Sequence, residues 1–136
     1  MLTNSRLHQK TLIISLVSAT GFIFAALSLG IADNPTGAIF MFAGLSALVL
    51  AVVHHWRTPR PFRKMMFLSL AGFPIMVILH NVLEVLAGRS PEWLDPVVTS
   101  LSVTAFLLAV LVLPVTFFAG IIGMGLTTFF NHEDSD

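Results

Sequence analysis

The chain has 136 residues, of which 56% are hydrophobic and 10% are charged, and its formal net charge is zero. Soluble domains carry about 25% charged residues, so this composition indicates a protein in lipid and excludes an ordinary soluble domain. The neutral balance excludes a chain-wide attraction to nucleic acid, and the absence of cysteine excludes disulfides, thiolate metal sites and thiol catalysis.

Four apolar stretches, each long enough to cross a bilayer, occupy nearly the whole chain. About 20 helical residues at 1.5 Å rise span the roughly 30 Å of hydrocarbon. The predicted fold is therefore all-α, a four-transmembrane-helix bundle that forms a single integral membrane domain over residues 1–136. The predicted helices cover about 10–32, 35–56, 64–87, and 96–122 or longer, and a disordered acidic tail follows over 131–136.

The first apolar stretch follows Arg6 and Lys10, a layout that secretory signal peptides share. Its apolar core runs from Thr11 to Ala32, which is longer than the roughly 7–15 apolar residues of a signal peptide. We therefore expect this helix to remain in the mature protein as the first membrane span.

Local chemistry marks where the other helices begin and end. Asn34-Pro35 and Asp95-Pro96 each place a good N-cap before a proline at the first helical position. We expect the second and fourth helices to begin there, and Gly88 to cap the end of the third. Inside the third helix, Pro74 removes one backbone hydrogen bond and is expected to cause a kink.

The fourth helix is longer than one straight span needs, because apolar residues continue from Pro96 to Asn131. We expect it to tilt, to protrude, or to bend at Pro114 and again near the glycines of 120–125. These glycines follow no strand, so they do not form a phosphate-binding loop. They are expected either to loosen the helix or to pack it tightly.

Small residues recur at helical spacing on three of the helices and predict the faces that pack together in lipid. They are Ser15, Ser18, Gly21 and Ala25 on the first helix, Gly37, Ala43, Gly44, Ala47 and Ala51 on the second, and Ser102, Ala105 and Ala109 on the fourth.

Lysine and arginine lie almost entirely on one side of the predicted membrane. Arg89 is alone on one side, and the other side holds Arg6, Lys10, Arg57, Arg60, Arg63 and Lys64. The positive-inside rule then predicts both termini in the cytoplasm, in a multi-pass protein of a prokaryotic cytoplasmic membrane. The loop 57–64, with four basic residues and two prolines, is expected to be extended and stiff and to lie on anionic lipid headgroups.

One polar cluster interrupts the third helix. His80 and Glu84 are four residues apart and share a face with Asn81 nearby, while Ser69, Gly72 and Met76 continue a stripe toward the cytoplasm. An ionisable residue inside a span is costly, so it normally faces the bundle and has a function. These three residues are the candidate proton, cation or partner site, with Asp33 or Asp95 contributing from the flanking loops.

Less specific interpretations of the same residues stay open. Glu84 could reach the headgroups or pair with Arg89, while His80 and Asn81 hydrogen-bond to neighbouring helices. A metal would need ligands from other helices, whose interiors offer only hydroxyls and amides, so no metal or other cofactor is expected. His54 and His55 lie about 20 Å in depth from His80 at 1.5 Å per residue, too far to share a haem.

The sequence contains no recognisable catalytic arrangement, so we expect no enzyme activity. The favoured function is an accessory or scaffold subunit of a membrane complex, docked through its small-residue faces. The alternative is a small oligomeric transporter or channel in which His80, Asn81 and Glu84 form an outward-facing proton or cation site. Both predict a homo-oligomer or a membrane-protein partner and no nucleic acid.

Overall fold

The structure, a computed structural model, describes the backbone of residues 2–32 and 34–133 and the side chains of 9–32 and 34–129. Over these residues the chain forms α1 (Leu2–Leu29), α2 (Pro35–Val52), α3 (Pro59–Ala87), α4 (Asp95–Leu107), the π-helical segment η1 (Leu108–Val112) and α5 (Leu113–Glu133). Four helical runs within these elements are long and apolar enough to cross a membrane: 9–29, 35–52, 59–87 and 95–129. The predicted all-α, multi-pass membrane fold is confirmed.

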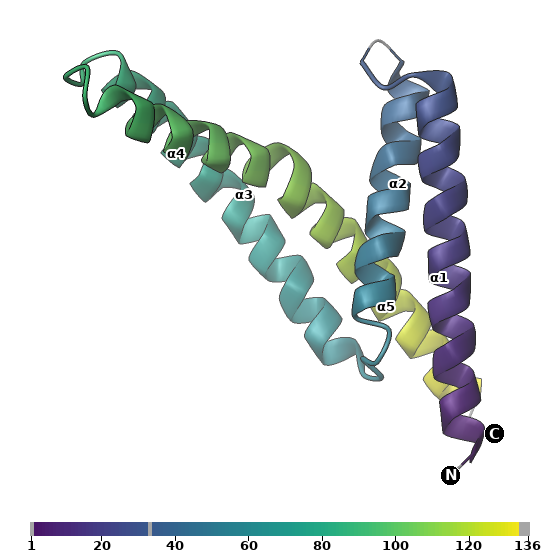
Figure 1. The fold of residues 1–136 in the computed structure, drawn as a ribbon. Coiled ribbons are helices and arrows are strands. Elements are labelled where there is room, and N and C mark those ends of the chain that lie inside the picture. Colours follow the sequence, from purple (N-terminus) through teal and green to yellow (C-terminus); the bar gives the residue numbers. More distant parts are fainter. Residues whose placement is uncertain (1, 33, 134–136) are drawn as a thin grey trace.

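The four spans are arranged as two antiparallel hairpins that form a V (Figure 1). One arm is α1 with α2, and the other is α3 with the continuous run α4–η1–α5. The arms meet where α2 crosses α5, and in the described structure α1 packs against α2 alone. The bundle is therefore open between its two arms rather than closed around one axis.

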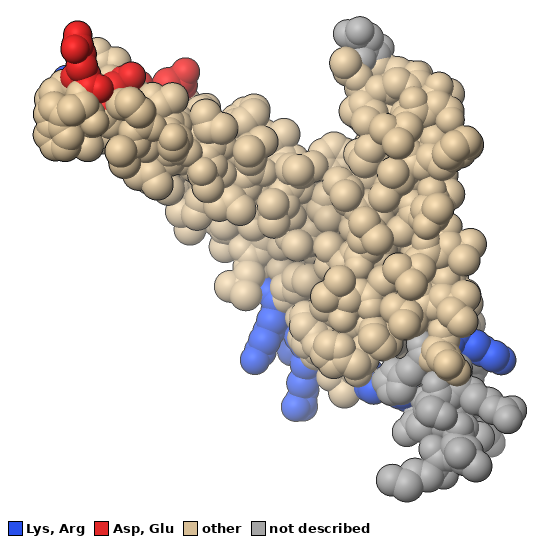
Figure 2. Space-filling view, viewed as in Figure 1, with Lys and Arg blue, Asp and Glu red and all other residues tan. Residues whose placement is uncertain are grey.

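Charge is separated along the molecule (Figure 2). Lysine and arginine gather at the end where the arms meet, which we call the basic end. Aspartate and glutamate lie at the far tip of the second arm, which we call the acidic end and which holds Glu92 and Asp95. The start of α1 and the end of α5 lie together at the basic end. That this end faces the cytoplasm stays a prediction from the positive-inside rule.

The first arm is held by close approach of two backbones. A methyl group added to Gly37 would overlap the carbonyl of Gly30, and one added to Gly44 would lie 2.6 Å from the Ile23 side chain and 3.2 Å from the Ala19 carbonyl oxygen. On α1 the buried residues of this contact are Ala19 and Ala26, at 1% and 0% exposure.

The small-residue prediction was right for α2 and α4 and partly wrong for α1. Gly37, Gly44, Ala47 and Ala51 are buried on α2, with Ala43 half-buried. Ser102 and Ala105 are buried on α4, and Ala109 is buried on η1, which continues it. On α1, Ser15, Ser18 and Ala25 are only half-buried and Gly21 is exposed. The actual seam follows Ala19 and Ala26, seven residues apart, because these lie opposite Gly44 and Gly37, which have the same spacing.

The second arm is closed near the basic end by Phe62 of α3. Its ring is buried against Gly123 of α5, where an added methyl would overlap it, and its carbonyl oxygen lies 3.0 Å from a methyl placed on Gly120. Gly125 has open space around it. Of Gly120, Gly123 and Gly125, the first two therefore pack α5 tightly against α3. Tight packing was one of the two alternatives expected from the sequence, the other being a loosened helix.

The arms are joined by one buried hydrogen bond at their crossing. The Ser46 hydroxyl of α2 donates to the Val115 carbonyl of α5 at 3.2 Å, and Ser46 itself is 1% exposed. A hydroxyl in lipid needs such a partner, because no water is present to replace it.

Helix boundaries near the basic end differ from the prediction. α2 ends at Val52 rather than near 56, and α3 begins at Pro59 rather than near 64. Pro59 and Pro61 fall in the first turn of α3, where a missing N–H is no loss, so they start the helix instead of keeping the chain extended. Arg60, Arg63 and Lys64 are therefore helical, and the connection is only 53–58.

Other boundaries follow from local conformation. Asn34 caps α2 as predicted, with its side-chain oxygen accepting from the backbone N–H of Thr36 at 3.0 Å. α1 ends before Gly30, whose φ of +82° suits glycine alone, and this stops the helix short of the predicted residue 32. α5 continues to Glu133, into the tail predicted to be disordered, and 134–136 lie outside the described residues.

The fourth span changes helix type just before Pro114. The N–H of Leu113 bonds to the carbonyl of Leu108, five residues back, which is the π-helical spacing. A proline has no N–H and crowds the carbonyl of the preceding turn, and a wider turn relieves this crowding. The predicted irregularity at Pro114 is thus a π turn. α3, by contrast, runs through Pro74 without a break in its assigned helix.

Candidate functional site

The polar stripe of α3 faces the fourth span for most of its length. The Ser69 hydroxyl is 2.7 Å from that of Thr116, and a methyl on Gly72 would lie 3.3 Å from the Leu113 side chain. Toward the basic end, the Ser69 hydroxyl is also 2.8 Å from the Met65 carbonyl oxygen, so its one hydrogen goes either to Met65 or to Thr116. This part of the stripe is a packing surface, and its polar atoms are satisfied within the arm.

His80 continues the stripe and is held against α4. Its Nδ1 lies 2.9 Å from the Ser102 hydroxyl and 3.1 Å from the Ser102 carbonyl oxygen. The Ser102 hydroxyl is also 3.3 Å from the backbone carbonyl of His80, and the His80 and Phe106 rings are 5.1 Å apart. The imidazole is therefore fixed at the α3–α4 interface, with 25% of its side chain exposed.

Glu84 lies one turn further toward the acidic end and is not enclosed. Its Oε2 is 3.7 Å from Nε2 of His80, and 69% of its side chain is exposed. Arg89, the predicted alternative partner, makes no ion pair with Glu84 among the described residues, where His80 is the one ion-pair partner of this carboxylate.

Asn81 is exposed as well and points away from His80's contacts. Its side-chain amide donates to the Val77 carbonyl of its own helix at 2.7 Å. His80, Asn81 and Glu84 therefore divide into one residue held inside the arm and two on the outer surface of α3. This surface is apolar elsewhere, since Ile78, Val82 and Val85 are all exposed.

The acidic loops add little to this cluster. Asp33 lies outside the described residues, and Asp95 accepts from the Thr99 hydroxyl at 3.5 Å within α4. In the described part of the chain, no group of three or more His, Cys, Asp or Glu residues could hold a metal ion. The arrangement can donate and accept hydrogen bonds and carry one charge at the surface of a span.

His54 and His55, in the connection between α2 and α3, lie at the other end of the molecule. His54 Nδ1 is 2.7 Å from the Ala51 carbonyl, and the His55 and Trp56 rings are 6.2 Å apart. His80 lies about 30 Å along α3 from its start at Pro59, at 1.5 Å per residue. His80 and the histidines of the 53–58 connection therefore have no common ligand position.

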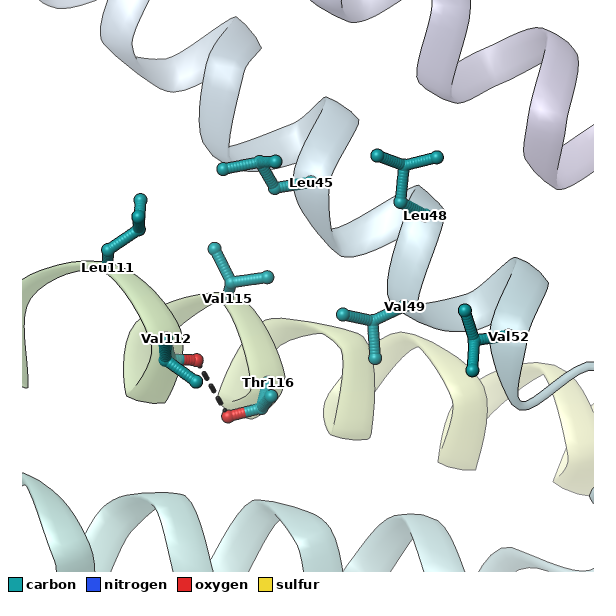
Figure 3. A pocket seen from close by; sticks show the side chains of 8 residues that line it. All are labelled: Leu45, Leu48, Val49, Val52, Leu111, Val112, Val115 and Thr116. Atoms are coloured by element: carbon teal, nitrogen blue, oxygen red, sulfur yellow. Dashed lines mark hydrogen bonds between the residues drawn. The ribbon is translucent and has the colours of Figure 1, made fainter. Parts of the chain in front are cut away.

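Sequence patterns did not predict two apolar grooves beside the α2–α5 crossing. The larger, about 350 Å³, lies between Leu45, Leu48, Val49 and Val52 of α2 and Leu111, Val112, Val115 and Thr116 of η1 and α5 (Figure 3). The smaller, about 290 Å³, is lined by Ile39, Phe42, Ala43, Ser46, Phe118 and Ile122. Their residues look like ordinary lipid-facing side chains until the crossing places them opposite one another.

Comparison with protein families, with curated proteins and with solved structures finds no match to this chain. We therefore infer its function from the fold and from the chemistry of these residues.

Proposed function

We propose that this protein is a non-enzymatic accessory or scaffold subunit that binds another membrane protein through the outer surface of α3. The observation that supports this is the exposure of Asn81 and Glu84 within an apolar span. Polar and ionisable side chains in membrane helices almost always face the interior of a bundle or a water-filled cavity. Here the chain's own bundle does not cover them, so a neighbouring helix is the expected cover.

The chemistry of the pair suits a contact between helices. Asparagine and charged side chains hydrogen-bond across helices in lipid, and such contacts are worth about 0.6–2 kcal/mol each. The partner surface should present donors toward Glu84 and a donor or acceptor toward Asn81. A second copy of this chain or a different membrane protein would meet this requirement.

A transporter or channel, the alternative, has less support. Among the described residues, the polar groups near His80 are Ser102 and Glu84, and the stripe between His80 and Ser69 packs on the fourth span. A pathway would have to be built by an oligomer along α3. For catalysis, the His80–Glu84 pair is the one candidate arrangement among the side chains that the structure describes.

Native mass spectrometry of the protein extracted gently from its own membrane tests the proposal. We expect a stoichiometric complex, and we expect Glu84→Gln and Asn81→Leu to lower the retained partner by about threefold or more, because about 0.6 kcal/mol is a factor of roughly three. Glu92→Gln, at the acidic tip and outside α3, is the matched control and should retain the partner.

Two results would contradict the subunit. One is a wild-type protein that is monomeric in native membranes, and the other is a complex that both α3 variants leave unchanged. If the purified wild type instead conducts protons or cations in vesicles and Glu84→Gln abolishes this flux without changing assembly, the transporter replaces the subunit.

A further inference from the structure

The larger groove of the α2–α5 crossing has a hydrocarbon lining and extends toward the basic end of the molecule, and we propose that it binds one anionic diacyl phospholipid. One acyl chain would lie between α2 and α5, and the phosphate would be held by basic residues at the start of α3. This site is separate from Asn81 and Glu84 and does not depend on the subunit proposed above.

The wall of the groove presents no free hydrogen-bonding group to water. Seven of its eight lining residues are leucine or valine. The eighth, Thr116, donates its hydroxyl to the Val112 carbonyl at 2.9 Å and lies 2.7 Å from the Ser69 hydroxyl (Figure 3). Its hydrogen-bonding capacity is therefore used inside the protein, and the surface that remains suits a hydrocarbon chain.

The size of the groove favours an acyl chain over a protein helix. From Leu45 to Val52 it extends about 10 Å along α2 at 1.5 Å per residue. This is about two helical turns, so only a short part of a packed helix could lie in the groove. A single acyl chain is narrow enough, and about 10 Å is two-thirds of one leaflet of a 30 Å hydrocarbon core.

The charges lie at the correct depth for the phosphate of such a lipid. Val52, at the end of the groove nearer the basic end, is the last residue of α2, and α3 begins after the short connection 53–58. Arg60, Arg63 and Lys64 are exposed on the first turns of α3, and Figure 2 shows lysine and arginine side chains extending from this end of the molecule. Each basic residue near an anionic surface is worth about 1 kcal/mol.

Retention of lipid by the full-length protein, measured by native mass spectrometry, tests the site. The protein is reconstituted in vesicles of equal parts phosphatidylglycerol and phosphatidylcholine, extracted in mild detergent and washed. We expect one phosphatidylglycerol per chain, retained in preference to phosphatidylcholine. Arg60→Gln with Arg63→Gln should lower this preference about 30-fold, which is about 2 kcal/mol, whereas Arg89→Gln at the acidic end should leave it unchanged.

The groove itself is tested by filling it. Val52→Phe lies at its exposed mouth and Val112→Phe in its wall, and each should remove most of the retained lipid of both kinds. Val103→Phe is the matched control, because Val103 is exposed on α4 and does not line the groove. Val52→Phe guards against misfolding, since Val52 is 75% exposed and its replacement displaces no core residue.

Four outcomes would overturn the lipid site. The first is equal retention of the two lipids by the wild type. The second is wild-type retention of phosphatidylglycerol by both phenylalanine variants, and the third is a loss in Arg89→Gln as large as in the double variant. A protein chain bound in place of lipid, and lost in Val112→Phe, would likewise assign the groove to a partner.

Discussion

The two arms of the V are held together by different means. In the α1–α2 arm, glycines allow the backbones to touch, and Gly37 and Gly44 leave no room for a methyl group. In the α3–α5 arm, side-chain hydrogen bonds join Ser69 to Thr116 and His80 to Ser102, alongside the Phe62–glycine contact. The first arm depends on shape, and the second combines shape with polar contacts.

The difference between the two arms indicates which contacts between helices are costly to lose in lipid. Between lipid-dissolved helices there is no hydrophobic driving force, so packing carries most of the association. The hydroxyls of the second arm have a second partner, because Ser69 also bonds to Met65 and Thr116 to Val112 on their own helices. A cross-helix bond that can be replaced within the helix contributes little, and steric fit should dominate the mutational effects.

The largest effect is expected at Gly37. Gly37→Ala places a methyl group on the Gly30 carbonyl, a backbone atom that cannot move aside, so the α1–α2 arm should lose about 3 kcal/mol of stability. Reversible unfolding in mixed detergent and sodium dodecyl sulfate micelles measures this change. Gly21→Ala is the control, because that helical glycine has open space and should be neutral or slightly stabilising. Equal effects at the two positions would contradict the close-approach account.

An intermediate effect is expected at Gly123, where the obstacle is a side chain. Gly123→Ala should cost about 1–3 kcal/mol, because the Phe62 ring must shift. In a Phe62→Ala background the same substitution should become nearly neutral, so the double-mutant cycle should show coupling of about 1–2 kcal/mol. Additive effects in this cycle would show that the ring and the glycine do not oppose one another.

The smallest effect is expected for the polar pair of the second arm. A cycle of Ser69→Ala and Thr116→Val should give a coupling of about 0.6 kcal/mol, the average found for hydrogen bonds between membrane helices. The same unfolding measurement applies. A coupling above about 2 kcal/mol would contradict this order of effects. It would show that the hydrogen bonds, rather than the close packing, contribute more to the stability of the molecule.

Much of the fold was predictable, because a run of apolar residues about 20 long can be satisfied in lipid only as a helix. The cap at Asn34 was predictable from its side chain, and α3 ends at Gly88 as expected, although Gly88 is right-handed with φ −64°. The prediction of Asp95 as an N-cap was wrong, because Leu94 is the cap residue and Asp95 is the first residue of α4. The start of α3 was not predictable, since Pro59 is compatible with both a stiff loop and a first helical turn. The V-shaped arrangement of the two arms could not be predicted from the sequence either. Residues that face lipid and residues that face another helix are both apolar in a membrane span.

The candidate site was predictable in composition and only partly in geometry. Spacing correctly placed His80 and Glu84 near one another, and their side chains are 3.7 Å apart. It could not show that His80 turns inward to Ser102 while Asn81 stays outside, because that depends on the rotation of α3 against α4. This rotation is set by contacts such as Gly72 with Leu113, which join residues distant in the chain.

The order of synthesis determines when the α2–α5 crossing can form. The α1–α2 arm is complete once Val52 has been made, whereas Ser46 must wait for Val115, made 69 residues later, to accept its hydrogen bond. Domains and hairpins generally assemble as units from the N-terminus during translation. The first arm can therefore insert and pack while the second is still on the ribosome, and the two arms can join through this bond only after Val115 has been made.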